Sequence, residues 1–141
     1  TDEMDNISFY PSKLQTKFSV CTLIREKLLE DEKIKELVDS RVYPVIAPEG
    51  TEGSYIVYVR DEYSIDRTKT GIAFHNCIVF ISCVSSSYDE SQKIADAVFQ
   101  ALDGKYKINT KAQNINSIEL IDSTEDYDGD CFIQTLSFSI K

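Results

Sequence analysis

The residues of this sequence that could do chemistry are one histidine, four cysteines and a group of carboxylates near the C-terminus. Catalysis by His75 would need a positioned reaction partner and a group that orients the ring, and the sequence shows no such constellation. A lone histidine beside a strand is more typical of a surface or half-buried residue. The five glycines are scattered, so there is no phosphate-binding loop. We therefore expect no catalytic residue, no cofactor and no enzymatic activity.

The carboxylates cluster around one predicted turn, and the group includes Glu125. Oxygen ligands of this kind suit calcium, which makes Asp126, Asp128 and Asp130 weak metal candidates. The order of ligands in an EF-hand loop is not met, because Gly129 comes too early and the terminal glutamate is missing. A solvated acidic hairpin is the favoured interpretation, and no metal site is predicted.

The four cysteines are spaced so that no two form a CxxC motif, which argues against a zinc or redox site. Cys77 and Cys83 lie on one face of one predicted strand, about 20 Å apart, far beyond the reach of a disulfide. We expect four free thiols at core or half-buried positions, in a reduced compartment.

Length and charge exclude several classes of function. The chain has 141 residues, about one domain, and a formal net charge of -9. A broad grip on nucleic acid needs clustered Lys and Arg, so we predict no direct nucleic-acid recognition. No apolar run approaches the roughly 20 residues of a membrane span, and no signal-like segment opens the chain, so no membrane partner is expected.

The elements that position these residues are organised around residues 76–104. Residues 77–84 are apolar on both alternating faces, which predicts a central strand buried on both sides. Ser87 and Glu90 fit a capping box that opens a helix, whose apolar residues recur at helical spacing up to Leu102. Gly104 then suits a left-handed helix end.

The N-terminal half predicts two helices, then a loop and a strand. Residues 1–12 read as a flexible N-terminal arm, and residues 13–29 as a helix capped by Ser12. A second, short helix follows Asp31. Further predictions are a loop at residues 45–53, a strand at 54–60, and a long polar hairpin loop at 61–71.

The C-terminal part predicts strands at residues 115–121 and 131–140, joined by a turn region at 122–130 that contains Asp128-Gly129. The last strand alternates apolar and hydroxyl residues, which is typical of a sheet covered on one face. Residues 13–141 are thus predicted to form a single α+β domain. It has N-terminal helices and a mainly antiparallel sheet of four to five strands, with one central helix packed on it.

Short motifs occur in a fixed order along residues 31–140. They are Ser40-Arg41-Val42-Tyr43-Pro44 after the short helix, Ala47-Pro48 in the next loop, Tyr55-Ile56-Val57-Tyr58 in a strand, Tyr88-Asp89-Glu90-Ser91 at the start of the long helix, and Tyr127-Asp128 at the last turn. In this series the chain resembles the tail completion, or tail terminator, proteins of long-tailed bacteriophages and prophages. The glycine usual in that family near the end of the second helix is replaced here by Asp39 or Ser40.

The resemblance implies a structural subunit that assembles into a ring, with six copies as the expected number, at the head-proximal end of the tail. Its partners would be itself, the tail tube protein and the head connector. Its location would be the bacterial cytoplasm during assembly and then the virion tail. We expect neighbouring copies to meet through the polar loops, at Arg60, Asp61, Glu62, Asp66, Arg67 and Lys69. The alternative from another class is a small-ligand or calcium-binding α+β module, or an unrecognised enzyme.

Overall fold

The structure is a computed structural model, and it describes residues 16–71, 73–104, 107–109 and 114–141. The predicted N-terminal arm and its cap Ser12 lie outside these residues. The helices are α1 (Val20–Glu30), α2 (Glu32–Val38) and α3 (Tyr88–Leu102). The main sheet contains β1 (Val42–Pro44), β2 (Tyr55–Arg67), β3 (Ala73–Ser85), β6 (Ile118–Asp128) and β7 (Cys131–Ile140), and β4 (Ile108–Asn109) pairs with β5 (Asn114–Ile115).

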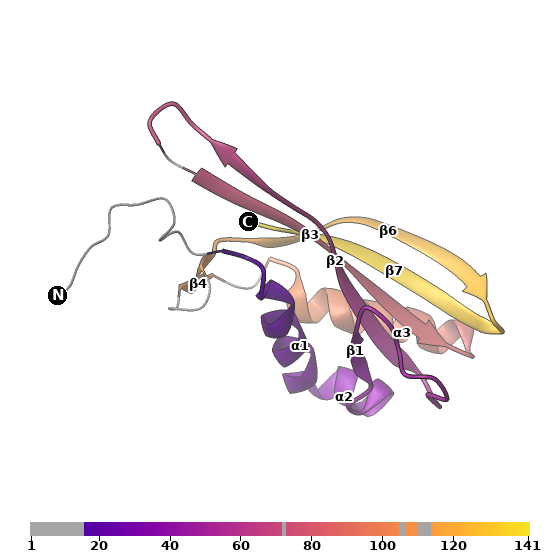
Figure 1. The fold of residues 1–141 in the computed structure, drawn as a ribbon. Helices are drawn as coiled ribbons and strands as arrows, with labels where there is room; N and C mark the ends of the chain where they lie inside the picture. Colours follow the sequence, from indigo (N-terminus) through magenta and orange to yellow (C-terminus); the bar gives the residue numbers. More distant parts are fainter. Residues whose placement is uncertain (1–15, 72, 105–106, 110–113) are drawn as a thin grey trace.

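The five strands of the main sheet lie in the order β1-β2-β3-β7-β6, so β3 is central as predicted (Figure 1). β2, β3, β7 and β6 pair antiparallel, and β1 adds to β2 as a parallel edge strand. The mainly antiparallel α+β fold is therefore confirmed. The short strand β1 was not predicted, because three residues ending in a proline carry almost no strand signal.

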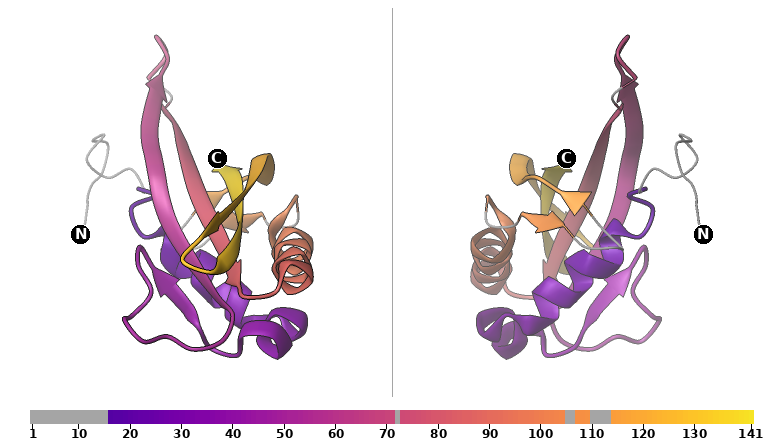
Figure 2. Two further views of the ribbon diagram at one scale, coloured as in Figure 1. Left: turned by 90° about the vertical axis from the view of Figure 1, so that its right-hand side faces the viewer. Right: turned by 90° about the vertical axis from the view of Figure 1, so that its left-hand side faces the viewer.

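The sheet has an inner face, which packs against the helices, and an outer face, which does not (Figure 2). On β3 the odd-numbered residues from Cys77 to Cys83 are buried, whereas Ile78 and Phe80 on the outer face are only half-buried. The prediction that β3 is buried on both sides is therefore wrong. The outer apolar side chains shield one another within the sheet, and no described helix covers them. The alternation predicted for β7 is confirmed: Leu136, Phe138 and Ile140 are buried.

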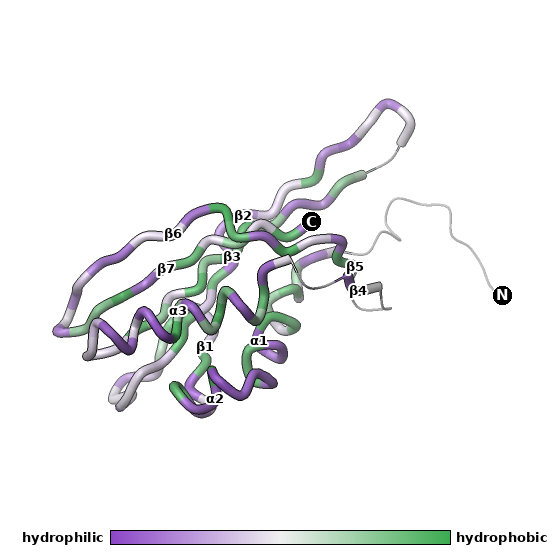
Figure 3. Tube along the Cα trace, turned by 180° about the vertical axis from the view of Figure 1, so that it is seen from behind, coloured by the Kyte–Doolittle hydropathy of each residue, from purple (hydrophilic) through white to green (hydrophobic). Residues whose placement is uncertain are grey.

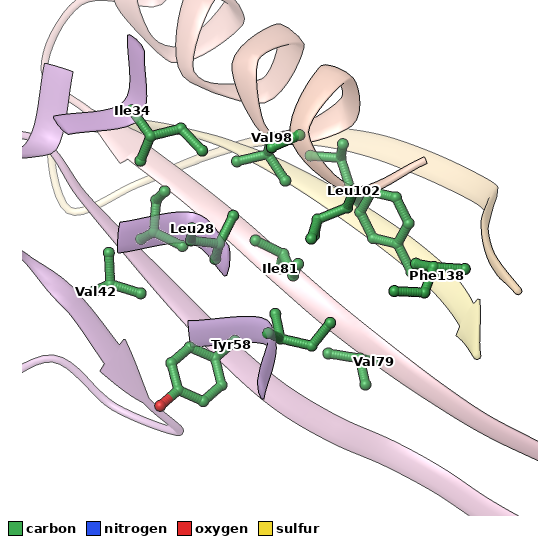
Figure 4. Close-up of a cluster of buried hydrophobic side chains, with 14 of the residues drawn as sticks. Leu28, Ile34, Val42, Tyr58, Val79, Ile81, Val98, Leu102 and Phe138 are labelled. Carbon is green, nitrogen blue, oxygen red and sulfur yellow. The ribbon is translucent and has the colours of Figure 1, made fainter. Parts of the chain in front are cut away.

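The hydrophobic core lies between α3, α1 and the inner face (Figure 4). Leu102 and Val98 of α3 meet Phe138 of β7 and Val79 and Ile81 of β3 in this cluster. The four cysteines carry free thiols; Cys77 and Cys83 are buried, and Cys21 and Cys131 are half-buried.

Helix α1 begins at Val20, not at residue 13, as far as the described residues reach. The segment before it is held in a non-helical conformation by the sheet, because the Lys17 backbone N–H donates to the Tyr63 hydroxyl at 3.0 Å. The second helix has the predicted cap, with Asp31 accepting from the Ile34 N–H. Asp39 has φ 56° and ψ -122°, a conformation that costs glycine least.

The predicted loop at 61–71 is wrong, whereas the one at 45–53 is confirmed. β2 continues to Arg67 and β3 starts at Ala73, so the polar segment is mostly strand. It is polar because it projects beyond the last pair between β3 and β7, Cys77 with Ile140, and needs no buried side chains (Figure 1). We call residues 64–71 and 73–76 the hairpin arm.

The turn predicted at residues 122–130 is shorter in the structure, because β6 runs to Asp128. Gly129 and Asp130 alone form the turn, with φ 59° and 66°, as a two-residue turn of the I′ type requires. Gly104 takes φ 63° after α3, as predicted, and its N–H donates to the Ile118 carbonyl.

The other end of the sheet is fixed to α3 by a polar network around Glu90. Its Oε1 accepts from the buried hydroxyls of Ser54, at 2.5 Å, and Ser85, at 2.9 Å. Ser87 caps α3 by accepting from the Glu90 N–H, as predicted, but the Glu90 side chain does not complete the capping box. These bonds join the start of β2, the end of β3 and the first turn of α3.

Replacement of Leu102 by Ala should lower the free energy of unfolding by about 2–5 kcal/mol, because a fully buried side chain leaves a cavity beside Phe138 and Ile81. Chemical denaturation measures the change. Gln100→Ala is the matched control, because it removes an exposed side chain from the same helix. Equal midpoints for the two variants would show that the buried face of α3 is misassigned.

Glu90→Gln should weaken the dependence of stability on acid. Hydrogen bonds from Ser54 and then Ser85 lower the pKa of Glu90 below its usual value. The stabilisation is therefore present above the unfolded-state pKa and is lost as the pH falls through the folded-state value. Urea denaturation at neutral pH and at about pH 4 should show a larger loss for the wild type than for Glu90→Gln. Identical losses would contradict this role.

Candidate assembly surface

The hairpin arm has two chemically different faces. Register places Tyr63, Ile65 and Arg67 on the inner face and Glu62 and Asp66 on the outer face. A β-bulge at Asp61, between Arg60 and Glu62, shifts the alternation of β2 by one residue. Even-numbered residues therefore face inward before the bulge, and odd-numbered residues face inward after it. Of the predicted contact residues, Arg60, Asp61 and Glu62 therefore lie at the base of the arm, Asp66 and Arg67 on its strand, and Lys69 in its turn.

An aromatic cluster supports the base of the arm on the inner side. The Phe18 and Tyr63 rings meet edge to face at 4.9 Å, and the Arg60 guanidinium lies 5.0 Å from the Phe18 ring centre. Arg60 Nη1 also donates to the Phe18 carbonyl at 3.2 Å. A groove of about 360 Å³ opens beside the cluster, lined by Thr16, Phe18, Arg60, Asp61, Tyr63 and Ile65. Its walls combine apolar and cationic groups, as a protein-docking surface does.

His75 belongs to this cluster and not to a catalytic site. Its Nδ1 lies 2.6 Å from the Tyr63 hydroxyl, which also accepts the Lys17 N–H. Burial lowers the pKa of His75, and the positive charges of Lys17 and Arg67 lower it further. The contact of this imidazole with the Tyr63 hydroxyl and ring stabilises the base of the arm.

The two long edges of the sheet present different surfaces. The β1 edge is closed to strand addition: the Val42 carbonyl accepts from Arg25 Nε, and the Pro44 carbonyl accepts from the Ile46 N–H. The latter bond closes a tight turn at Val45, whose φ of 65° is unusual for a β-branched residue. This turn exposes Val45 and Ile46 by 69% and 77%.

The β6 edge is open and acidic. The Leu120 N–H donates to Asp103 Oδ1 and the Ile118 carbonyl accepts from Gly104, so the edge is capped only where β6 begins. Beyond this point all residues of β6 are exposed. Register places four carboxylates on its outer face, and we call them the acidic row: Glu119, Asp122, Asp126 and Asp128.

The metal candidates do not converge. Asp126 and Asp128 belong to the acidic row on the strand, and Asp130 lies in the turn, with its Oδ1 3.4 Å from the Tyr127 hydroxyl. Within the described residues no group of three or more His, Cys, Asp or Glu side chains could hold a metal ion. Glu125 points to the inner side instead, where it accepts from Tyr88 and Gln134.

Sequence reasoning missed the two residues that orient the arm, Phe18 and Tyr63. The available signal was the alternation Tyr63, Ile65, Arg67, which continues the period of the strand through a segment that charge alone marks as a loop. Phe18 lies within the helix predicted for residues 13–29, but in the structure it precedes α1 and is 64% exposed. No helix in the described part of the chain is long and apolar enough to cross a membrane.

The described residues thus form a one-sided sheet with a projecting arm and two dissimilar edges, and among them the candidate metal-ligating groups do not converge. The chain belongs to the family of tail completion protein gp17, whose family model matches residues 22–140. It is therefore a structural protein of a phage tail, which bears out the resemblance seen in its motifs.

A solved structure with the same fold is a chain described as part of the virion of a native gene transfer agent particle. It superposes with a TM-score of 0.72, over 83% of this chain and 89% of that chain, at 20% sequence identity. At this identity the likeness establishes the fold. A search of curated proteins found no match.

Calcium should not bind specifically at the acidic turn, because Asp126, Asp128 and Asp130 do not share one coordination centre. Calorimetric titration should show no saturable binding tighter than millimolar. A one-to-one micromolar isotherm that Asp128→Asn abolishes would overturn this prediction and favour a calcium-binding module.

Proposed function

We propose that copies of this chain close into a ring that ends the tail tube and joins the tail to the head. The observation that carries the proposal is membership of the tail completion family over residues 22–140. Six copies is the number that the family resemblance implies. The partners are the chain itself, the tail tube protein and the head connector, in the bacterial cytoplasm during assembly and afterwards in the virion tail. The role is structural and needs no catalytic step.

The shape of the subunit supports ring closure. A closed ring needs a heterologous contact, in which one surface of a copy meets a different surface of the next. The β1 side carries the apolar turn at Val45 and Ile46 and the hairpin arm, whereas the β6 side is acidic. The two sides of the sheet thus differ in the way that a heterologous contact requires.

Deletion of the gene from its phage or prophage tests the proposal. Electron microscopy of the lysate should show heads and tails that fail to join, or tails of uncontrolled length. The wild-type gene supplied in trans is the control and should restore joined particles. Normal infectious particles from the deletion strain would contradict the proposed function.

A further inference from the structure

We propose that the inner face of the hairpin arm of one copy docks onto the acidic row of the next copy. This inference rests on the ring proposed above and names the two surfaces that meet in it. The occupant of the acidic row is thus a second copy of this chain. Three properties of the structure carry the inference: the reach of the arm, the distribution of charge over its faces, and the spacing of the charges.

The arm reaches beyond the body of its own subunit. In two views it projects past the ends of β6 and β7, away from α2 and α3 (Figures 1 and 2). Register places Asp126 beside Ile133, Ile133 beside Val84, and Val84 beside Tyr55, so Asp126 is level with the start of β2. Arg67 lies twelve residues further along β2, about 35 Å away at the rise of a strand. Arg67 therefore cannot contact Asp126 of its own subunit.

Charge favours the inner face of the arm for this contact. That face presents Arg67 together with the partly exposed Ile65, and Arg60 and Tyr63 lie at its base. The opposite face carries the carboxylates, and Asp66 is held there by a hydrogen bond from Asn76 Nδ2 at 2.9 Å. Only the inner face thus combines cations with apolar surface.

The acidic row offers the complementary pattern. β6 contains no lysine or arginine, and the neighbouring outer face of β7 carries no charged residue; its side chains there are Cys131, Ile133, Thr135, Ser137 and Ser139. Hydrophilic residues run along β6 and along the end of the arm (Figure 3). Carboxylates two to four residues apart on one strand face repel one another, and cations from a neighbour would relieve that repulsion.

The spacing of the two sets of charges agrees. Arg60 and Arg67 are seven residues apart with one bulge between them, which is six strand steps or about 20 Å. Asp122 and Asp128 are also six steps apart on a continuous stretch of strand, again about 20 Å. An arm lying along β6 can therefore place one cation near Asp122 and another near Asp128, whereas Glu119 lies two strand steps beyond Asp122. Lys69, in the exposed turn, adds a third cation beyond Arg67.

A charge exchange in the deletion strain tests the contact. Arg67→Glu with Lys69→Glu should cause loss of joined particles when supplied in trans, and so should Asp122→Lys with Asp126→Lys. The four changes together should restore particles, because attraction returns with its sign reversed. Asp66→Lys is the matched control on the opposite face of the arm, and it should complement like wild type. Circular dichroism of each purified variant checks that the subunit is folded.

A disulfide cross-linking experiment tests the arm contact independently of the proposal that the copies form a ring. Arg67→Cys combined with either Asp122→Cys or Asp128→Cys, in a background with Cys21→Ser and Cys131→Ser, should give a ladder of disulfide-linked multimers in oxidised particles for one of the two pairs. Each single cysteine variant should give none. Joined particles without a ladder for either cysteine pair, or full complementation by both reversed pairs, would overturn the arm contact and leave the ring standing. Normal particles from the deletion strain would instead overturn the proposed function itself.

Discussion

The unequal pairing of β3 with its two neighbours determines the shape of this protein. β3 pairs with β2 along its whole length, from Ala73 to Val84, but with β7 only from Cys77 onwards. Where three strands and the helices meet, alternate side chains of β3 are fully buried. Where β7 ends, the same hairpin continues as a two-stranded ribbon, which has too little apolar area to bury and is polar on its surface. One pair of strands therefore supplies both the centre of the core and the projecting arm.

Two clusters of different chemistry stabilise the ends of this hairpin. At the sheet end, Glu90 accepts from two buried serines and fixes α3 to β2 and β3. At the base of the arm, Tyr63 packs against Phe18 and is linked to His75, which ties the segment before α1 to the hairpin. An isolated ribbon is marginally stable in water, so these contacts matter more to the arm than they would to a strand in the middle of a sheet. The base of the arm is thereby held against the segment that precedes α1.

The sequence is sufficient to predict the elements whose period is set by burial. Helix α3 and strand β7 alternate between core and solvent, and both were predicted at their observed positions. The errors arose where burial stops. Residues 61–67 and 122–128 are strands exposed on both faces, so no apolar period marks them, and their charged residues resemble a loop. The outer face of β3 was misjudged for the opposite reason, because apolar residues there are shielded by neighbouring strands and not by a second layer.

The surface of the hairpin arm could be predicted from the sequence only in part, again because the segment was expected to be a loop and not a strand. Charge placed Arg67 and Lys69 in an exposed hairpin, which is correct, but the division of the arm into a cationic inner face and an acidic outer face exists only once residues 61–67 form a strand. A loop has no faces, whereas a strand separates alternate residues. The bulge at Asp61 then decides which face each later charge occupies, and no propensity in the sequence locates that bulge.

The separation of carboxylates on β6 from cations on the arm matters because the chain has a large negative net charge. Each copy carries a formal charge of -9, so copies brought together in any assembly repel one another at long range. Over distances longer than the roughly 8 Å screening length of physiological salt this repulsion is weakened, and contact is then decided by the charges that meet directly. A subunit with uniformly mixed charges would gain little from such contacts. This one gathers carboxylates on the outer face of β6 and cations on the inner face of the arm, at opposite ends of the sheet. The same strand geometry that buries one face of β3 thus also separates the carboxylates of β6 from the cations of the arm, and this separation is what the proposed contact between copies uses.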